Sequence, residues 1–259
     1  MELYIAGGVG EHGRNCFFLQ NGGDAILVDC GLMAGSDDPL PRLTESQIRK
    51  LKAVFLTHSH ADHTGALPWL LRQGYTGPII STTPTLQQLP FIVQNAVALE
   101  QVAPRNEKCN GITWGLSGHC EGSVWLKLDW DDKAILFSGD YTEQSAVYPC
   151  DVLRNQVADL AVLDCAYGHD STLWNDSVTA AAAAVENLLE KTPIVFLPVP
   201  KYGRGLDLLL QIRRRLPYVP MYGDAHFCKQ TEIALVDRKW YKPLPVSYTH
   251  LTLPTKLEV

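Results

Sequence analysis

Hydrophobic residues recur in the first part of the chain as short runs separated by glycine turns. The runs occupy residues 3–6, 16–19 and 25–28, and glycine pairs stand at 7–8 and 22–23. Short apolar runs bounded by glycine are typical of β-strands. We therefore predict a three-stranded β-meander at the start of the chain.

Beyond this meander, apolar strand patterns alternate with helical ones. Residues 53–56 form a short apolar run typical of a buried strand, and residues 79–82 form another strand. Between them a helix is expected after Gly65, since Pro68 is tolerated only in a first turn. Residues 86–102 space their apolar side chains like an amphipathic helix that faces a core. This alternation predicts an α/β fold.

The second half of the chain continues in the same way. Residues 134–137 read as a buried strand, and the alanine-rich stretch 177–189 predicts a helix with Asp176 or Ser177 as its N-cap.

Composition describes an ordinary globular protein with no marked bias. The 259 residues are 46% hydrophobic and 19% charged, so one to two domains are expected. The net charge of −6 gives no overall basic field for nucleic acid, although a local basic groove stays compatible with it. No signal peptide or membrane span is visible, and seven scattered cysteines without a C-x-x-C pair predict reduced thiols in the cytoplasm.

Three histidines and an aspartate fall within six residues, directly after the apolar run 53–56. They are His58, His60, Asp62 and His63. Because the run predicts a buried strand, these side chains lie on the loop at its carboxyl end. Neutral imidazole and carboxylate groups are the ligands of Zn²⁺ and similar ions, and clustered histidines would repel one another once protonated. We interpret the cluster as a metal site.

Further candidate ligands follow in order along the chain. His119 comes after a short apolar run, Asp140 comes after the strand 134–137, and each is preceded by a glycine that lets the backbone turn tightly toward an ion. Asp29 ends the third strand of the meander at the same sheet edge. Asp29 either orients a metal ligand or satisfies the backbone of a turn, and both interpretations stay open.

The segment 58–63 resembles the H-x-H-x-D-H motif of the metallo-β-lactamase superfamily, and His119 and Asp140 match the ligands that follow it. The resemblance implies an αββα sandwich that holds two divalent metal ions, Zn²⁺ being expected and Mn²⁺ the alternative. It assigns His58, His60 and His119 to one ion, Asp62 and His63 to the other, and Asp140 to a bridge. It also implies that Asp62 and Asp140 are catalytic, with Asp62 orienting a hydroxide activated by both metals.

The chain after Asp140 resembles one branch of that superfamily, the β-CASP nucleases. Asp164, followed by Tyr167-Gly168, is similar to the acidic-x-x-Tyr-Gly segment that opens their second domain, and Asp164 occupies the place of their first acidic motif. Residues 194–210 look like their strand, Pro-containing turn, Gly-Arg pair and leucine-rich helix. Arg204 and Lys201 are therefore candidate contacts for substrate phosphate. The arginine run 213–215 reads more simply as a solvated helix face.

The resemblance implies an incomplete αββα domain in residues 1–158, the first part of a β-CASP α/β domain in residues 159–245, and a non-native tail in residues 246–259. It implies a metal-dependent cytoplasmic ribonuclease with RNA as its substrate, with no membrane association and with a homodimer as one open assembly state. An ester or thioester hydrolase is disfavoured, because such enzymes do not need the second domain. A catalytically silent scaffold of an RNA-processing complex is also disfavoured, because a scaffold has no chemical reason to keep all four clustered ligands.

The end of the chain departs from the β-CASP pattern. Residues 246–255 resemble the conceptual translation of a sequencing adapter, and His250 lacks the glycine-flanked setting of the other ligands. The family pattern also implies later histidines that complete the second metal site. We therefore expect these 259 residues to hold the second ion weakly and to have low activity; metal analysis that finds two tightly bound ions per chain would contradict this.

Overall fold

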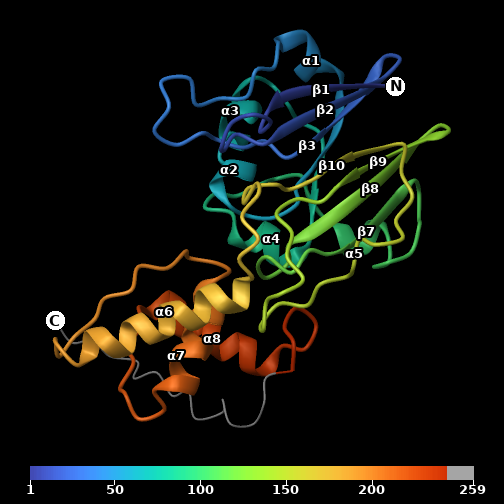
Figure 1. Ribbon diagram of the computed structural model, residues 1–259. Helices are drawn as coiled ribbons and strands as arrows, with labels where there is room; N and C mark the ends of the chain where they lie inside the picture. The colour runs from blue at the N-terminus through green and yellow to red at the C-terminus, as the bar shows by residue number, and fades with distance from the viewer. Residues whose placement is uncertain (244–259) are drawn as a thin grey trace. The chain divides into compact units, whose positions relative to one another are not determined.

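The computed structural model describes residues 1–243, which divide into two compact units (Figure 1). The first unit comprises Met1–Ser117, Gly122–Tyr141 and Asp151–Ala166. The second comprises Gly118–Glu121, Thr142–Cys150 and the described residues from 167 onward. The domain boundary expected after residue 158 stays a prediction, and the tail expected at 246–259, with His250, lies outside the described residues.

The first unit contains a mixed six-stranded sheet in the order β1-β2-β3-β4-β5-β6. Its strands are β1 (Glu2–Gly7), β2 (Cys16–Asn21), β3 (Asp24–Val28), β4 (Leu51–Phe55), β5 (Ile79–Ser81) and β6 (Ala96–Ala98). The first three strands are antiparallel, which confirms the predicted meander. The strands β3 to β6 run parallel, so their carboxyl ends meet at one edge of the sheet.

Helices cover one face of this sheet (Figure 1). The helices of the first unit are α1 (Glu45–Lys50), α2 (Ala61–Thr64), α3 (Leu67–Arg72), α4 (Thr83–Gln88) and α5 (Leu99–Val102). Because side chains alternate along a strand, Phe18 and Leu27 join Leu67 and Leu70 in the core under the helices. Pro68 lies in the first turn of α3, as predicted.

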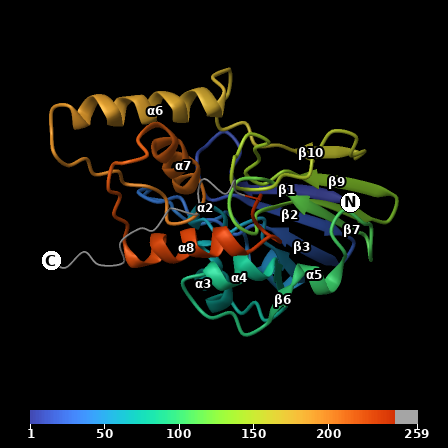
Figure 2. The ribbon, with the colours of Figure 1, turned by 90° about the horizontal axis from the view of Figure 1, so that it is seen from below.

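A second sheet of four strands packs on the opposite face (Figure 2). Its order is β10-β9-β8-β7, with β7 (Ile112–Leu116), β8 (Val124–Trp130), β9 (Lys133–Phe137) and β10 (Leu160–Val162). The ring centroids of Phe17 on β2 and Phe137 on β9 are 5.7 Å apart, and Val124 donates its N–H to the Thr57 carbonyl at 2.9 Å. The order of helices, sheet and sheet confirms the predicted α/β class.

The helix predicted over 86–102 is wrong. α4 ends at Gln88, and Leu89 is extended, with φ −60° and ψ 135°. Leu89 precedes Pro90, and a residue before proline is pushed out of the helical region. The chain then returns to the sheet as β6, parallel to β5. The periodic apolar residues of this stretch therefore serve a turn and a short strand.

The second unit contains three long helices, α6 (Trp174–Leu189), α7 (Gly205–Arg215) and α8 (Ala225–Val236). α6 and α7 pack through a small core of Ala182, Val185 and Ile212. The carboxylate of Asp207 is buried and accepts hydrogen bonds from Ser145 Oγ at 2.7 Å and from the Ala146 N–H at 2.6 Å. Burial raises the pKa of Asp207 above its ordinary value.

Two details predicted for this unit are wrong. The N-cap of α6 is Leu173, so Asp176 lies in the first turn, where its charge favours the helix N-terminus. Residues 194–199 form no strand ladder within the described part of the chain. Pro198 and Pro200 have no N–H to donate to such a ladder.

No helix in residues 1–243 combines the length and apolar character needed to cross a membrane.

The contact between Phe17 and Phe137 predicts that truncating Phe17 alone strongly lowers the free energy of unfolding. Phe17 is 6% exposed and Phe137 is 1% exposed, so replacing Phe17 by alanine leaves a cavity between the sheets. We expect Phe17→Ala to lower the free energy of unfolding by about 3–5 kcal/mol. Urea unfolding monitored by tryptophan fluorescence measures this change.

Ile92→Ala is the control, because Ile92 is 92% exposed and its truncation should change stability by less than about 0.5 kcal/mol. Equal urea midpoints for the two variants would show that the ring contact does not hold the sheets together.

Candidate metal centre

The predicted metal ligands of residues 58–63 follow β4 at the carboxyl edge of the six-stranded sheet. β3 and β4 are parallel neighbours, with Val28 paired to Phe55. Asp29 and Thr57 therefore leave the sheet side by side, and the Asp29 N–H donates to the Phe55 carbonyl at 2.8 Å. The parallel pairing thus places Asp29 next to the loop that begins at His58.

Backbone hydrogen bonds fix the shape of that loop. The N–H groups of Asn15, Cys30 and Leu32 donate to the carbonyls of Asp62, His63 and Ala61 at 2.8 to 2.9 Å. Gly31 allows this close approach, since a Cβ atom there would stand 1.7 Å from the Asp62 carbonyl oxygen. The ligand loop is therefore held by the strand ends beneath it.

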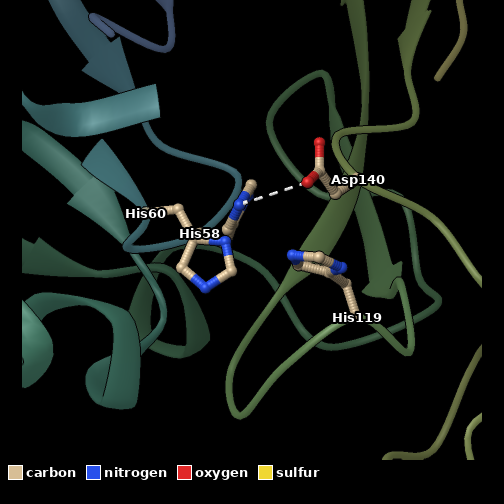
Figure 3. Close-up of side chains that lie close together, drawn as sticks. All are labelled: His58, His60, His119 and Asp140. Atoms are coloured by element: carbon tan, nitrogen blue, oxygen red, sulfur yellow. Dashed lines mark ion pairs between the residues drawn. The ribbon is translucent and has the colours of Figure 1, made fainter. Parts of the chain in front are cut away.

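Four side chains converge in the first group, His58, His60, His119 and Asp140 (Figure 3). One ligand atom from each lies within 4.8 Å of the others. His58 and His60 come from the loop after β4, His119 from the loop between β7 and β8, and Asp140 follows β9. The His58 Nε2 lies 3.8 Å from Asp140 Oδ2.

A second group comprises His58, Asp62 and His63. The His63 Nε2 lies 3.7 Å from Asp62 Oδ2 and 3.1 Å from Asp140 Oδ1. The two oxygens of Asp140 thus face different histidines, Oδ2 toward His58 and Oδ1 toward His63. The Asp140 carboxylate therefore lies near residues of both groups.

Asp29 orients the His63 ring through a contact with its Nδ1 atom. The His63 Nδ1 lies 2.7 Å from Asp29 Oδ2, and the Thr57 N–H and hydroxyl also donate to the Asp29 carboxylate. A hydrogen bond at Nδ1 leaves Nε2 directed toward Asp62 and Asp140. Asp29 therefore has the orienting role that was one of its two interpretations, and it also ties down the turn at Thr57.

Charge around His63 favours its protonated form in the metal-free protein. Burial alone would lower the pKa of the His63 imidazole. The negative charges and hydrogen bonds of Asp29 and Asp140 raise it by more than burial lowers it, so the pKa lies well above its ordinary value. The same carboxylates stabilise a metal ion at this place, because a bound cation replaces the proton.

Asp164 supports the position of Asp140 through the backbone. Its Oδ2 accepts from the Tyr141 N–H at 3.2 Å, and its own N–H donates to Ser138 Oγ at 2.7 Å. These contacts tie the end of β10 to the residues on either side of Asp140. Asp164 is in neither group of candidate ligands, and its role as a separate acidic motif stays a prediction.

The candidate phosphate contacts lie in the second unit. Lys201 lines a cavity of about 320 Å³ together with Asp224, His226 and Phe227. Arg204 is the N-cap residue of α7. Within the arginine run, Arg215 pairs with Glu186, and Arg213 donates to the Pro217 carbonyl at 2.9 Å. These contacts favour a structural interpretation for that run.

Sequence reasoning missed Asn15 as part of the site. The Asn15 Nδ2 lies 3.0 Å from His63 Nε2 and 3.3 Å from the Asp62 carbonyl oxygen. Asn15 precedes β2 and looks like an ordinary turn residue in the sequence. Only the pairing of β2 with β3 brings it to the ligand loop.

The donor atoms suit a divalent transition metal. Imidazole nitrogens and carboxylate oxygens bind Zn²⁺ and Mn²⁺, whereas thiolates are absent from both groups of ligands. The residues present therefore fit the two ions that the sequence pattern implies. The two groups of candidate ligands are near enough to each other for the Asp140 carboxylate to reach residues of both.

The chain is similar in sequence to known proteins. Residues 9–188 match the family model of the metallo-β-lactamase superfamily. The chain is 27% identical over 278 positions to transcription termination factor FttA of Methanosarcina mazei, covering 90% of this chain and 43% of that protein. It is 24% identical over 251 positions to ribonuclease TTHA0252 of Thermus thermophilus, covering 87% and 58%. The chain thus spans about half the length of these relatives.

Among solved structures, the chain is similar to the metallo-β-lactamase fold protein YhfI from Bacillus subtilis. The TM-score is 0.39 with 17% sequence identity, over 53% of this chain and 61% of that one.

The hydrogen bond between Asp29 and His63 predicts that metal affinity depends on a residue that binds no metal. Asp29→Asn removes the charge that orients the Nδ1 side of His63. We expect divalent metal affinity to fall about 10- to 100-fold, as for other partners of metal-ligating histidines. Competition with a chromophoric chelator for Zn²⁺ and Mn²⁺ measures the affinity, and circular dichroism checks the fold.

Asp24→Asn is the matched control, because Asp24 is exposed at the start of the same strand. An Asp29→Asn protein that binds both metals as tightly as the control would show that Asp29 is a turn residue only.

Proposed function

The chain belongs to the metallo-β-lactamase superfamily, and from this premise we propose that it is part of a metal-dependent ribonuclease of the β-CASP group. The observation that supports this most strongly is the placement of Asp140 between His58 and His63. An aspartate there is suited to two divalent cations of the kind that phosphodiester hydrolysis uses.

Each ligand has a role in this proposal. His58, His60 and His119 would hold one ion, Asp62 and His63 would hold the other, and Asp140 would serve both. When bound, the two ions polarise a water molecule and offset the charge that develops on the phosphate oxygens. Asp62, whose side chain is 33% exposed, accepts a hydrogen bond from the attacking water and so directs its lone pair toward phosphorus. Asp164 keeps Asp140 in position through the Tyr141 N–H.

The metal is proposed to be Zn²⁺, because three imidazole nitrogens and one carboxylate match its usual four-coordinate set. Mn²⁺ is the alternative, since it accepts the same nitrogen and oxygen donors.

RNA is the proposed substrate. The printed names of the relatives are those of a ribonuclease and of transcription termination factors, and these activities belong to those proteins. Arg204 and Lys201 supply positive charge for a phosphate backbone despite the net charge of −6. All seven cysteines are free, which supports the proposed cytoplasmic location. A homodimer stays a prediction.

The proposed bridging role of Asp140 predicts that one substitution strongly reduces RNA cleavage. In the intact gene product, Asp140→Ala removes the carboxylate that lies within 4 Å of both His58 and His63, and we expect cleavage of single-stranded RNA to fall at least about 100-fold. A fluorescently labelled RNA separated on a gel measures the rate with Zn²⁺ or Mn²⁺ added.

Asp37→Ala, at an exposed loop position, serves as the control and should cleave like the unmodified protein. Retained cleavage by Asp140→Ala would refute the bridging role. Faster turnover of a thioester than of RNA by the unmodified protein would instead identify a small-molecule hydrolase.

A further inference from the structure

Arg204 lies against two aromatic rings in the second unit. Its Cζ atom is 5.3 Å from the centroid of the Tyr167 ring and 5.1 Å from that of the Trp174 ring. Both distances lie within the roughly 6 Å over which a guanidinium is attracted to a ring face. The three side chains are named here the Arg204 stack, and Arg204 follows the two aromatic residues by 30 or more positions in the sequence.

The backbone around the Arg204 stack is fixed at both ends. Tyr167 accepts a hydrogen bond at its carbonyl from the Asp170 N–H at 3.0 Å, and the Trp174 N–H donates to Gln144 Oε1 at 2.6 Å. Trp174 starts α6 and Arg204 caps α7, and these helices pack against each other. The stack is therefore preorganised before any ligand arrives.

The guanidinium keeps its hydrogen-bonding capacity. Across residues 1–243, Arg204 donates no hydrogen bond and forms no ion pair, unlike Arg215, which pairs with Glu186. A guanidinium has five N–H donors in its plane, and stacking on rings leaves that plane open. A half-buried cation held by rings alone suits an anionic ligand.

The Tyr167 ring has free surface for a ligand. Its residue is 55% exposed although it contacts the cation. Exposed aromatic faces next to arginine are the platforms on which proteins stack unpaired bases. A phosphate next to such a base would lie within reach of the guanidinium edge.

We propose that the Arg204 stack is a subsite for one nucleotide of single-stranded RNA, with the base on the Tyr167 ring and a phosphate on the Arg204 N–H edge. This inference rests on the proposed ribonuclease function and adds to it a preference for unpaired RNA. Bases in a duplex are stacked on one another, so their faces cannot reach a side-chain ring. The second ring, that of Trp174, holds the Arg204 guanidinium in position.

The position of Tyr167 in the chain supports this assignment. Tyr167 follows Asp164 by three residues, a stretch that spans about 10 Å at most. Asp164 in turn accepts a hydrogen bond from the residue after Asp140. Tyr167 is therefore close along the chain to the residue that supports Asp140.

A thermodynamic cycle between protein and RNA tests the stacking. The intact gene product is kept metal-free with chelator, and binding of a short fluorescein-labelled single-stranded RNA is followed by anisotropy. The RNA is used unmodified and with an abasic site at each position in turn. We expect Tyr167→Ala and one abasic site each to weaken binding about 5- to 100-fold, with no further loss when they are combined.

Three further variants accompany this cycle, two as controls and one as a test of the phosphate contact. Tyr167→Phe keeps the ring and should bind like the unmodified protein. Tyr218→Ala removes a tyrosine that is 96% exposed and should also leave binding unchanged. Arg204→Gln should weaken every RNA alike and lower the slope of log affinity against log salt by about 0.7. Thermal melting shows whether each variant is folded.

Two results would overturn the subsite. One is a folded Tyr167→Ala protein with unchanged affinity, and the other is additive losses from Tyr167→Ala and every abasic site. The ribonuclease proposal is judged separately, by cleavage after metal is restored. Binding with the expected cycle but no cleavage would contradict that proposal and leave the subsite standing; no binding by the unmodified protein would contradict both.

Discussion

The parallel pairing of β3 with β4 is the constraint on which the metal centre depends. It buries the Asp29 carboxylate, which is 1% exposed, beside the first residues of the ligand loop. A buried carboxylate is costly unless it is hydrogen-bonded or paired, and Asp29 has both Thr57 and His63 as partners. Satisfying Asp29 therefore fixes the direction of His63. The histidine that faces Asp140 is set by the sheet as much as by its own loop.

The sequence was most informative where one short segment carries both the strand and the ligands. The apolar run 53–56 and the spacing of His58, His60, Asp62 and His63 were sufficient to predict the cluster and its place at a strand end. Glycine before His119 and Asp140 marked the remaining ligands. The β-meander and Pro68 in the first turn of α3 were also predictable, because each depends on local chemistry.

Other features depend on contacts between distant segments. Asn15 and Thr57 look like ordinary turn residues until the strand register brings them to His63. The helix expected over 86–102 failed because Pro90 interrupts an otherwise periodic pattern and β5 offers a partner for β6. Arg204 was expected to contact phosphate, yet its contacts with Tyr167 and Trp174 could not be read from residues 30 or more positions away.

The two units place different chemistry on different supports. In the first unit, rigid strand ends hold imidazoles and carboxylates that suit divalent cations. In the second, Arg204 at the start of α7 lies against the rings of Tyr167 and Trp174, a combination that suits an unpaired nucleotide. The proposed metal centre and the proposed RNA contacts therefore have separate structural origins.

Manganese titration of the intact gene product, followed by electron paramagnetic resonance, tests the central claim most directly. If Asp140 bridges two ions roughly 3.5–4 Å apart, the account predicts two Mn²⁺ per chain with an exchange-coupled spectrum. A single bound ion, or two ions with uncoupled spectra, would contradict the two-metal site on which the proposed function depends.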